Sequence, residues 1–135
     1  PIKLLADTRQ KFPLAADIAS MFGAEVHVVV ISTKNNKRDL KRLESYSNQC
    51  VGYLNYRKIP VVTSTVVGDS LPNLTLNYAR AVNADMIIMM SSAIDKWNVV
   101  LGSYAQQMLN KSHLPLLSIK PMPRQLPTGF SAYGG

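Results

Sequence analysis

The sequence predicts an α/β fold, a doubly wound open parallel sheet with helices on both faces. Four nearly continuous apolar runs, rich in β-branched residues, lie at 24–32 (AEVHVVVIS), 60–67 (PVVTSTVV), 84–90 (ADMIIMM) and 114–119 (LPLLSI). Such runs are typical of strands that are covered on both faces of a parallel sheet. Helical patterns separate them, and this alternation predicts βαβ units with right-handed crossovers.

Four helices are expected around these strands. The first begins near Pro13, because proline is tolerated in the first helical turn, and it ends at Gly23, a residue type favoured just past a helix C-terminus. The second falls within residues 37–57 and places Cys50 on its apolar face, which predicts that Cys50 fills the core. The remaining two are expected within residues 70–82 and 102–111.

The chain length predicts one domain with a short tail. Its 135 residues suit a single apolar core, which we assign to residues 1–120. Residues 121–135 are rich in proline and glycine without periodicity, so a tail or an extended arm is expected there. The first strand is expected to be truncated, because only Pro1 and Ile2 precede the loop that leads to the first helix.

The composition favours some cellular locations and binding partners over others. No apolar run approaches the roughly 18 residues that cross a bilayer, and no export signal opens the chain, which predicts a soluble protein without a membrane partner. A single cysteine cannot form an internal disulfide, and this favours a reducing, cytoplasmic location. The net charge of +7 favours anionic partners. The densest basic stretch, residues 34–42, lacks interleaved aromatic residues, so a solvated helix start is favoured over nucleic-acid binding.

The order and spacing of these segments resemble the universal stress protein family. The similar segments are PIK at 1–3, GAEVHVVVI at 23–31, VVTSTVVG at 61–68, ADMIIMM at 84–90, GS at 102–103 and LPLLSIK at 114–120. Lys3 lies twenty positions before Gly23, which is the family's interval between a strand-end aspartate and its Gly-Ala pair. The resemblance covers residues 1–120. It implies a five-stranded sheet of the Rossmann-like, adenine nucleotide alpha hydrolase-like type, with ATP bound in some members and not in others.

ATP-binding members of the family resemble one another in a glycine loop, G-x2-G-x9-G-[ST]. Glycines bring backbone N–H groups against phosphate oxygens, and the last Gly-Ser pair places a helix N-terminus and a hydroxyl at the anion. Here only Gly102 and Ser103 match. Met90 and Ala93 occupy the other glycine positions, or Ser92 when the count runs back from Gly102, and the loop is one residue short.

The position of the family's strand-end aspartate also differs. Lys3 occupies it, and an ammonium group has no lone pair with which to accept a hydrogen bond from a nucleotide. Ligands of such sheets bind beyond the carboxyl ends of the strands. We therefore expect a vestigial nucleotide or anion crevice there, formed by Gly102, Ser103, Ser92 and Lys3. A plain helix N-cap at Gly102 and Ser103, with no ligand, is the simpler interpretation of that pair.

These features predict a stress-response domain with a degenerate ATP-binding motif that acts through protein contacts, has no cofactor and is not an enzyme. The alternative is a module that binds ATP or another phosphate-containing anion through a modified loop, with slow ATP hydrolysis. The resemblance further implies a homodimer through the last strand, or a tandem domain of the same family as partner. His27 is expected to be a packed strand residue and His113 a loop residue, with neither in a catalytic or metal site.

Overall fold

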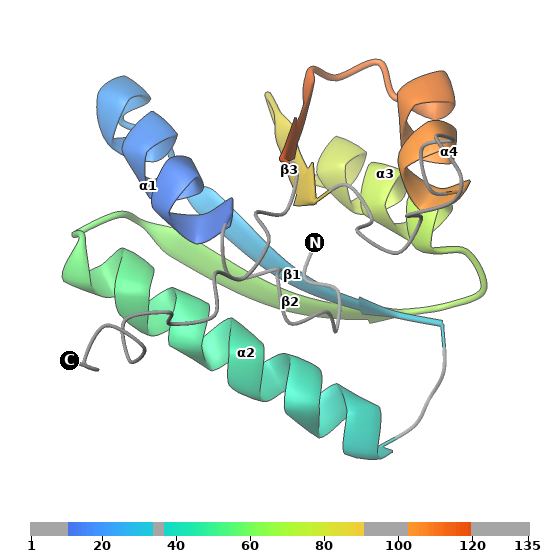
Figure 1. Ribbon diagram of the computed structural model, residues 1–135, viewed down its shortest axis with the longest axis horizontal. Helices are drawn as coiled ribbons and strands as arrows, with labels where there is room; N and C mark the ends of the chain where they lie inside the picture. Colours follow the sequence, from blue (N-terminus) through green and yellow to red (C-terminus); the bar gives the residue numbers. More distant parts are fainter. Residues whose placement is uncertain (1–10, 34–36, 91–102, 120–135) are drawn as a thin grey trace, which may run out of the picture.

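Helices and strands alternate along the computed structural model, which describes residues 11–33, 37–90 and 103–119 (Figure 1). This alternation confirms the predicted α/β fold with parallel strands. The elements in chain order are α1 (Lys11–Phe22), β1 (Val26–Ser32), α2 (Lys37–Tyr56), β2 (Val61–Val67), α3 (Leu71–Ala81), β3 (Ile87–Met90), α4 (Ser103–Lys111) and β4 (Leu116–Ile119).

The first sheet pairs β1 with β2 in parallel, in a register that runs from Val26 opposite Val61 to Ser32 opposite Val67. One face of this pair carries α1 and α2, because Phe12 of α1 and Leu54 of α2 share a core with Val28 and Val30 of β1. The predicted apolar face of α2 is confirmed, and Cys50 is buried in this core.

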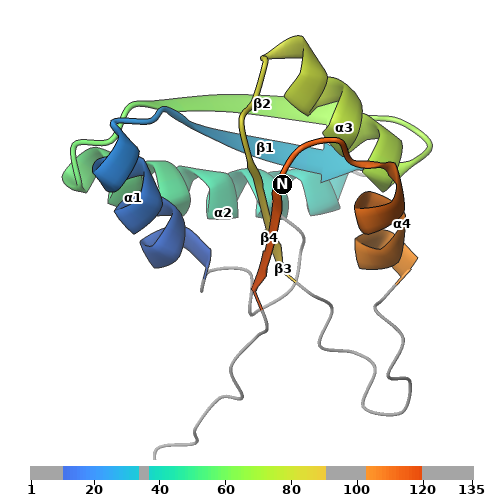
Figure 2. The ribbon, with the colours of Figure 1, turned by 90° about the horizontal axis from the view of Figure 1, so that it is seen from above.

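Helix α3 packs on the opposite face of the same pair, where the hydroxyl of Tyr78 contacts His27 of β1 and Ser64 of β2. The second sheet pairs β3 with β4 in parallel, from Ile87 opposite Leu116 to Met90 opposite Ile119 (Figure 2). A second core joins it to α3 and α4 and contains Ala79, Ile87, Met89, Ala105 and Met108. Helices therefore lie on both faces, as a doubly wound fold requires.

Two glycines lie at the ends of elements. Gly23 follows α1 with a φ of +62°, a left-handed conformation that favours glycine, and the N–H of Ala24 closes the helix end on the carbonyl of Ala19. This geometry confirms the predicted helix end. At Gly68, just past β2, an added Cβ would lie 2.9 Å from Cδ2 of Leu74 on α3, so a larger residue there would require the Leu74 side chain to shift.

Three predicted strand features need correction. β3 begins at Ile87 and not at Ala84, because the N–H of Ala84 bonds to the carbonyl of Ala79 and so completes the end of α3. β4 begins at Leu116, because the side chain of Ser112 closes a turn on the backbone of Leu114.

The third correction concerns β2, which was expected to be covered on both faces. Instead Val62 is 37% exposed, Val67 is 44% exposed, and Thr63 and Thr65 are exposed as well. The reason is the position of β2 in the sheet. Among the described strands β2 pairs only with β1, so it lies at the edge of the sheet, where coverage is incomplete.

The predicted five-stranded sheet is not confirmed. The described strands form two separate parallel pairs, and a cavity lies between β1 and β3. Residues from both α1 and α3 line that cavity, so it is bordered from both faces of the first sheet. The predicted truncated strand at Pro1 and Ile2 and the predicted tail at 121–135 fall outside the described residues.

Candidate functional site

The crevice expected from the sequence lies largely outside the described residues. β3 ends at Met90 and α4 begins at Ser103, so the structure confirms that a helix starts at the Gly-Ser pair. Lys3, Ser92 and Gly102 are not among the described residues, and neither is Ala93. Convergence of these groups on one anion therefore stays a prediction.

A hydrogen-bonded cluster fixes the first turn of α4 against α3. The hydroxyl of Thr75 donates to the carbonyl of Leu71 at 2.8 Å, so Thr75 accepts the hydrogen bond that joins it to the Tyr104 hydroxyl at 3.0 Å. Burial raises the pKa of Tyr104, which keeps this hydroxyl protonated and able to donate at neutral pH. A side-chain hydrogen bond thus joins the first turn of α4 to α3, one residue from Ser103.

The far end of α4 is also attached to α3. Lys111 Nζ donates to Asn73 Oδ1 at 3.2 Å, and Ala105 and Met108 are buried between the two ends. The first turn of α4 itself carries no acidic residue that would oppose an anion at this helix N-terminus. The start of α4 is therefore compatible with a plain helix N-cap and also with an anion contact at Ser103.

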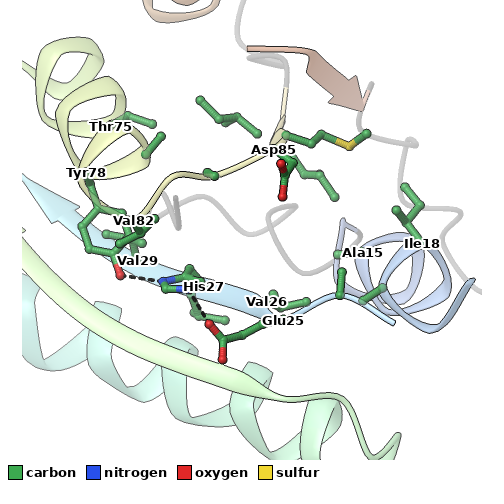
Figure 3. Close-up of a pocket in the computed structure, with 18 of the residues that line it drawn as sticks. Ala15, Ile18, Glu25, Val26, His27, Val29, Thr75, Tyr78, Val82 and Asp85 are labelled. Carbon is green, nitrogen blue, oxygen red and sulfur yellow. Dashed lines mark hydrogen bonds and ion pairs between the residues drawn. The ribbon is translucent and has the colours of Figure 1, made fainter. Parts of the chain in front are cut away.

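A cavity of about 350 Å³ lies elsewhere, between β1 and β3 (Figure 3). Its walls are largely apolar and include Ala15 and Ile18 of α1, Val29 of β1 and Val82 after α3. Most of its described lining comes from residues 24–29 and 84–88, the amino-terminal parts of the strands and the residues that precede them, while Ile31 lies further along β1. The predicted crevice belongs at the carboxyl ends of the strands.

A chain of polar side chains lies along one wall of this cavity. His27 Nε2 lies 2.8 Å from Glu25 Oε1, and His27 Nδ1 lies 2.9 Å from the hydroxyl of Tyr78 (Figure 3). The same hydroxyl lies 3.0 Å from Ser64 Oγ. All contacts are satisfied if Ser64 donates to Tyr78, Tyr78 donates to a neutral His27, and His27 donates to Glu25.

This chain connects α3 to both strands of the first sheet. The rings of His27 and Tyr78 also meet edge to face, with centroids 5.8 Å apart. Because each member is already hydrogen-bonded within the chain, its geometry supports a structural role for His27, as the sequence predicted. The partner Tyr78 was missed, since it lies 51 residues away. The only local signal was Glu25 and His27, two residues apart on one side of a strand.

The second histidine of the sequence lies in a loop, as expected. His113 is exposed in the turn that precedes β4. Within the described ranges, no three of the His, Cys, Asp and Glu side chains gather closely enough to hold a metal ion. None of the helices that the structure describes is both long and apolar enough to cross a membrane.

Comparisons with solved structures support the fold. A universal stress protein from Archaeoglobus fulgidus superposes with a TM-score of 0.77 and 19% identity, covering 89% of each chain. The same comparison finds the universal stress protein from Archaeoglobus fulgidus in complex with dAMP, with a TM-score of 0.73, 19% identity, and coverage of 89% of this chain and 93% of that one. A universal stress protein family member from Burkholderia pseudomallei gives 0.68 at 14% identity, covering 90% and 92%.

These identities are low, so the structural likeness alone establishes only the Rossmann-like architecture. No curated protein sequence matches the chain. The sequence profile of the Universal stress protein family, however, matches residues 9–120, which is most of the chain. The chain therefore belongs to the universal stress protein family.

Proposed function

We propose that this chain is a regulatory stress-response domain that acts through protein contacts, with a degenerate nucleotide loop, no cofactor and no enzymatic activity. The observation that carries the proposal is the loss of the phosphate-binding glycines. Met90 and Ala93 stand in two glycine positions, the loop before Gly102 is one residue short, and Lys3 replaces a hydrogen-bond acceptor. An alanine in a left-handed conformation costs about 1 kcal/mol more than glycine, and the several changes oppose binding together.

A second candidate is a module that binds ATP or another phosphate-containing anion through a modified loop. One observation favours it: a structurally similar universal stress protein is known in complex with dAMP. The start of α4, which is hydrogen-bonded to α3, is compatible with an anion at Ser103, since a helix N-terminus favours negative charge. In this case Lys3 and Ser92 would complete the contacts and slow ATP hydrolysis would accompany binding.

Calorimetry with Mg-ATP separates the two candidates. We expect no binding tighter than about 100 μM, which corresponds to about 5.5 kcal/mol. Tighter binding that disappears in Ser103→Ala and Lys3→Ala would replace the first proposal with the second. Silent calorimetry in the natural chain, followed by binding after Lys3→Asp, Met90→Gly, Ala93→Gly and one inserted loop residue, would support decay of an ancestral site.

The complete architecture belongs to the same proposal. We infer that β1–β2 and β3–β4 are parts of one five-stranded sheet, with the short opening strand at Pro1 and Ile2 between β1 and β3. The cavity between these strands supports this, because it is bordered by elements from both faces. Amide hydrogen exchange tests it: slow exchange throughout residues 3–7 would show a full central strand, and the proposed truncation would be wrong.

The assembly and the cellular location of the protein belong to the same proposal. We propose a cytoplasmic protein that pairs through the outer edge of β4, either with a second copy or with a tandem domain of the same family. Supporting this, β4 is an apolar strand that pairs only with β3 among the described strands. Light scattering that gives the monomer mass of 14.9 kDa at every concentration would exclude the homodimer, and a homologous domain encoded next to this one would support the tandem form.

A further inference from the structure

The edge strand β2 has a sequence that reads the same in both directions. Its seven residues are VVTSTVV, centred on Ser64, and every residue except that serine is β-branched. No charge, proline or glycine interrupts the strand. Natural edge strands are usually protected by such residues, because unpaired N–H and C=O groups otherwise attract another strand. β2 carries none of these protections within its length.

Hydrogen bonds at both ends of β2 show which backbone groups face outward. The carbonyl of Pro60 accepts from the N–H of Val26, and the N–H of Gly68 donates to the carbonyl of Ser32. Because the direction alternates along a strand, even-numbered residues of β2 face β1 and odd-numbered residues face the open edge. Pro60 is even-numbered, so its missing N–H does not interrupt that edge.

We propose that β2 forms an antiparallel pair with β2 of a second copy of this chain, with the two-fold axis at Ser64. In this register Thr63 lies opposite Thr65 of the second copy. Both residues direct their N–H and C=O groups outward, so they form a hydrogen-bonded pair, and Val61 and Val67 form another. The palindrome makes every facing pair one of like residues, threonine with threonine and valine with valine, which are favourable cross-strand pairs.

The strand itself brings no like charges together. Its seven residues carry no charge, and the nearest charged residues, Lys58 and Asp69, lie outside it and are exposed. The general repulsion between two chains of net charge +7 opposes association, and salt screens this repulsion.

Among the described residues, α2 packs loosely against the middle of β2. A cavity of about 190 Å³ lies between them, lined by Thr63 and Thr65 together with Glu44 and Asn48 of α2. In the described part of the chain, α2 therefore does not cover this part of β2 tightly. The interface is separate from the crevice near Ser103 and from the β4 edge, so it does not depend on either proposal made for them.

Light scattering over a concentration series tests the interface with matched variants. Ser118→Lys on β4 serves as the background, because it removes any pairing through that edge: this variant should still dimerise, and adding Thr65→Lys to it should shift it toward the monomer mass of 14.9 kDa. Both substituted residues are exposed, and circular dichroism checks that each variant stays folded. A Ser118→Lys chain that is monomeric, or one whose dimer survives the addition of Thr65→Lys, would overturn the proposal.

Cross-linking tests the register itself. Ser64→Cys places a thiol opposite its own copy at a non-hydrogen-bonded position, where Cβ atoms are about 4.5–5.5 Å apart, so oxidation should link the two chains. The control Val62→Cys should not cross-link, because its copy lies four residues further along the strand, about 13 Å away. Cross-linking of Val62→Cys alone would contradict the register.

Discussion

The two halves of the fold differ in strand length and in the size of their cores. In the first, β1 and β2 are seven residues long and pair along their full length, and Val28, Val29, Val30 and Ile31 of β1 are all buried. In the second, β3 and β4 have four residues each, and β4 reaches only intermediate burial at its apolar positions. Among the described residues the first core contains nine buried side chains and the second contains five.

The length of the strands limits the apolar area that each half can bury. Helix ends take up residues before the strands in both halves, because the N–H of Ile59 bonds to the carbonyl of Leu54 before β2, and the N–H of Ala84 bonds to the carbonyl of Ala79 before β3. In the second half a serine turn shortens β4 as well, so that β3 and β4 have four residues each, against seven in β1 and β2. The first half therefore has more apolar area to bury, and stability should be distributed unequally between the two halves.

The largest expected effect lies in the first core. Leu54 of α2 is fully buried there, and Leu54→Ala should lower the free energy of unfolding by about 3–5 kcal/mol, because it loses apolar contacts and leaves a cavity. Urea denaturation measures this. The control is Tyr56→Ala on the same helix, 82% exposed, which should change stability by less than about 0.5 kcal/mol.

The corresponding change in the second core should cost less. Met108 of α4 is fully buried, and Met108→Ala should lower the free energy of unfolding by about 2–3 kcal/mol. The smaller core and its partly exposed neighbours allow more collapse around the vacated space. The same urea experiment applies, and a loss larger than that of Leu54→Ala would contradict the unequal distribution.

The sequence predicted helices better than strands. α2 and α3 fall inside their expected ranges, because apolar residues recur at helical spacing in α2 and Ser70 with Pro72 marks the start of α3. Apolar runs, in contrast, do not reveal where a strand stops or how many neighbours it has. In β2 the threonines at 63 and 65 alternate with other residues and were the only sign that this strand is half-exposed.

A third effect concerns the hydrogen bonds that join α3 to the first sheet. Tyr78→Phe removes the hydroxyl shared by His27 and Ser64 and should cost about 1–2 kcal/mol, because it leaves two partly buried polar groups without this partner. Thermal unfolding measures the loss. The matched variant Tyr104→Phe removes a hydroxyl from the second half, where Thr75 keeps its bond to Leu71, so its cost should be smaller.

The candidate site was less predictable than the fold. Glycine spacing near Gly102 located a helix start correctly, since the requirement for such a start is local in sequence. The cavity between β1 and β3 was not foreseen, because it depends on how α1, β1, α3 and β3 meet in space. His27 was correctly expected to be a packed residue, but its hydrogen-bond partner on α3 follows only from the tertiary structure.

The smallest expected effect is at the start of α3, the helix that contacts both halves. The hydroxyl of Ser70 accepts a hydrogen bond from the N–H of Asn73 at 3.4 Å, a long contact. Ser70→Ala should therefore cost about 0.5 kcal/mol, at the low end of the range for N-cap serines. Ser70→Asp retains an acceptor and adds a charge that favours a helix N-terminus, so it should match or exceed the natural stability. Urea denaturation of both variants measures the difference, and a loss above about 1.5 kcal/mol in Ser70→Ala would mean that this cap positions α3 for both halves and does more than end a helix.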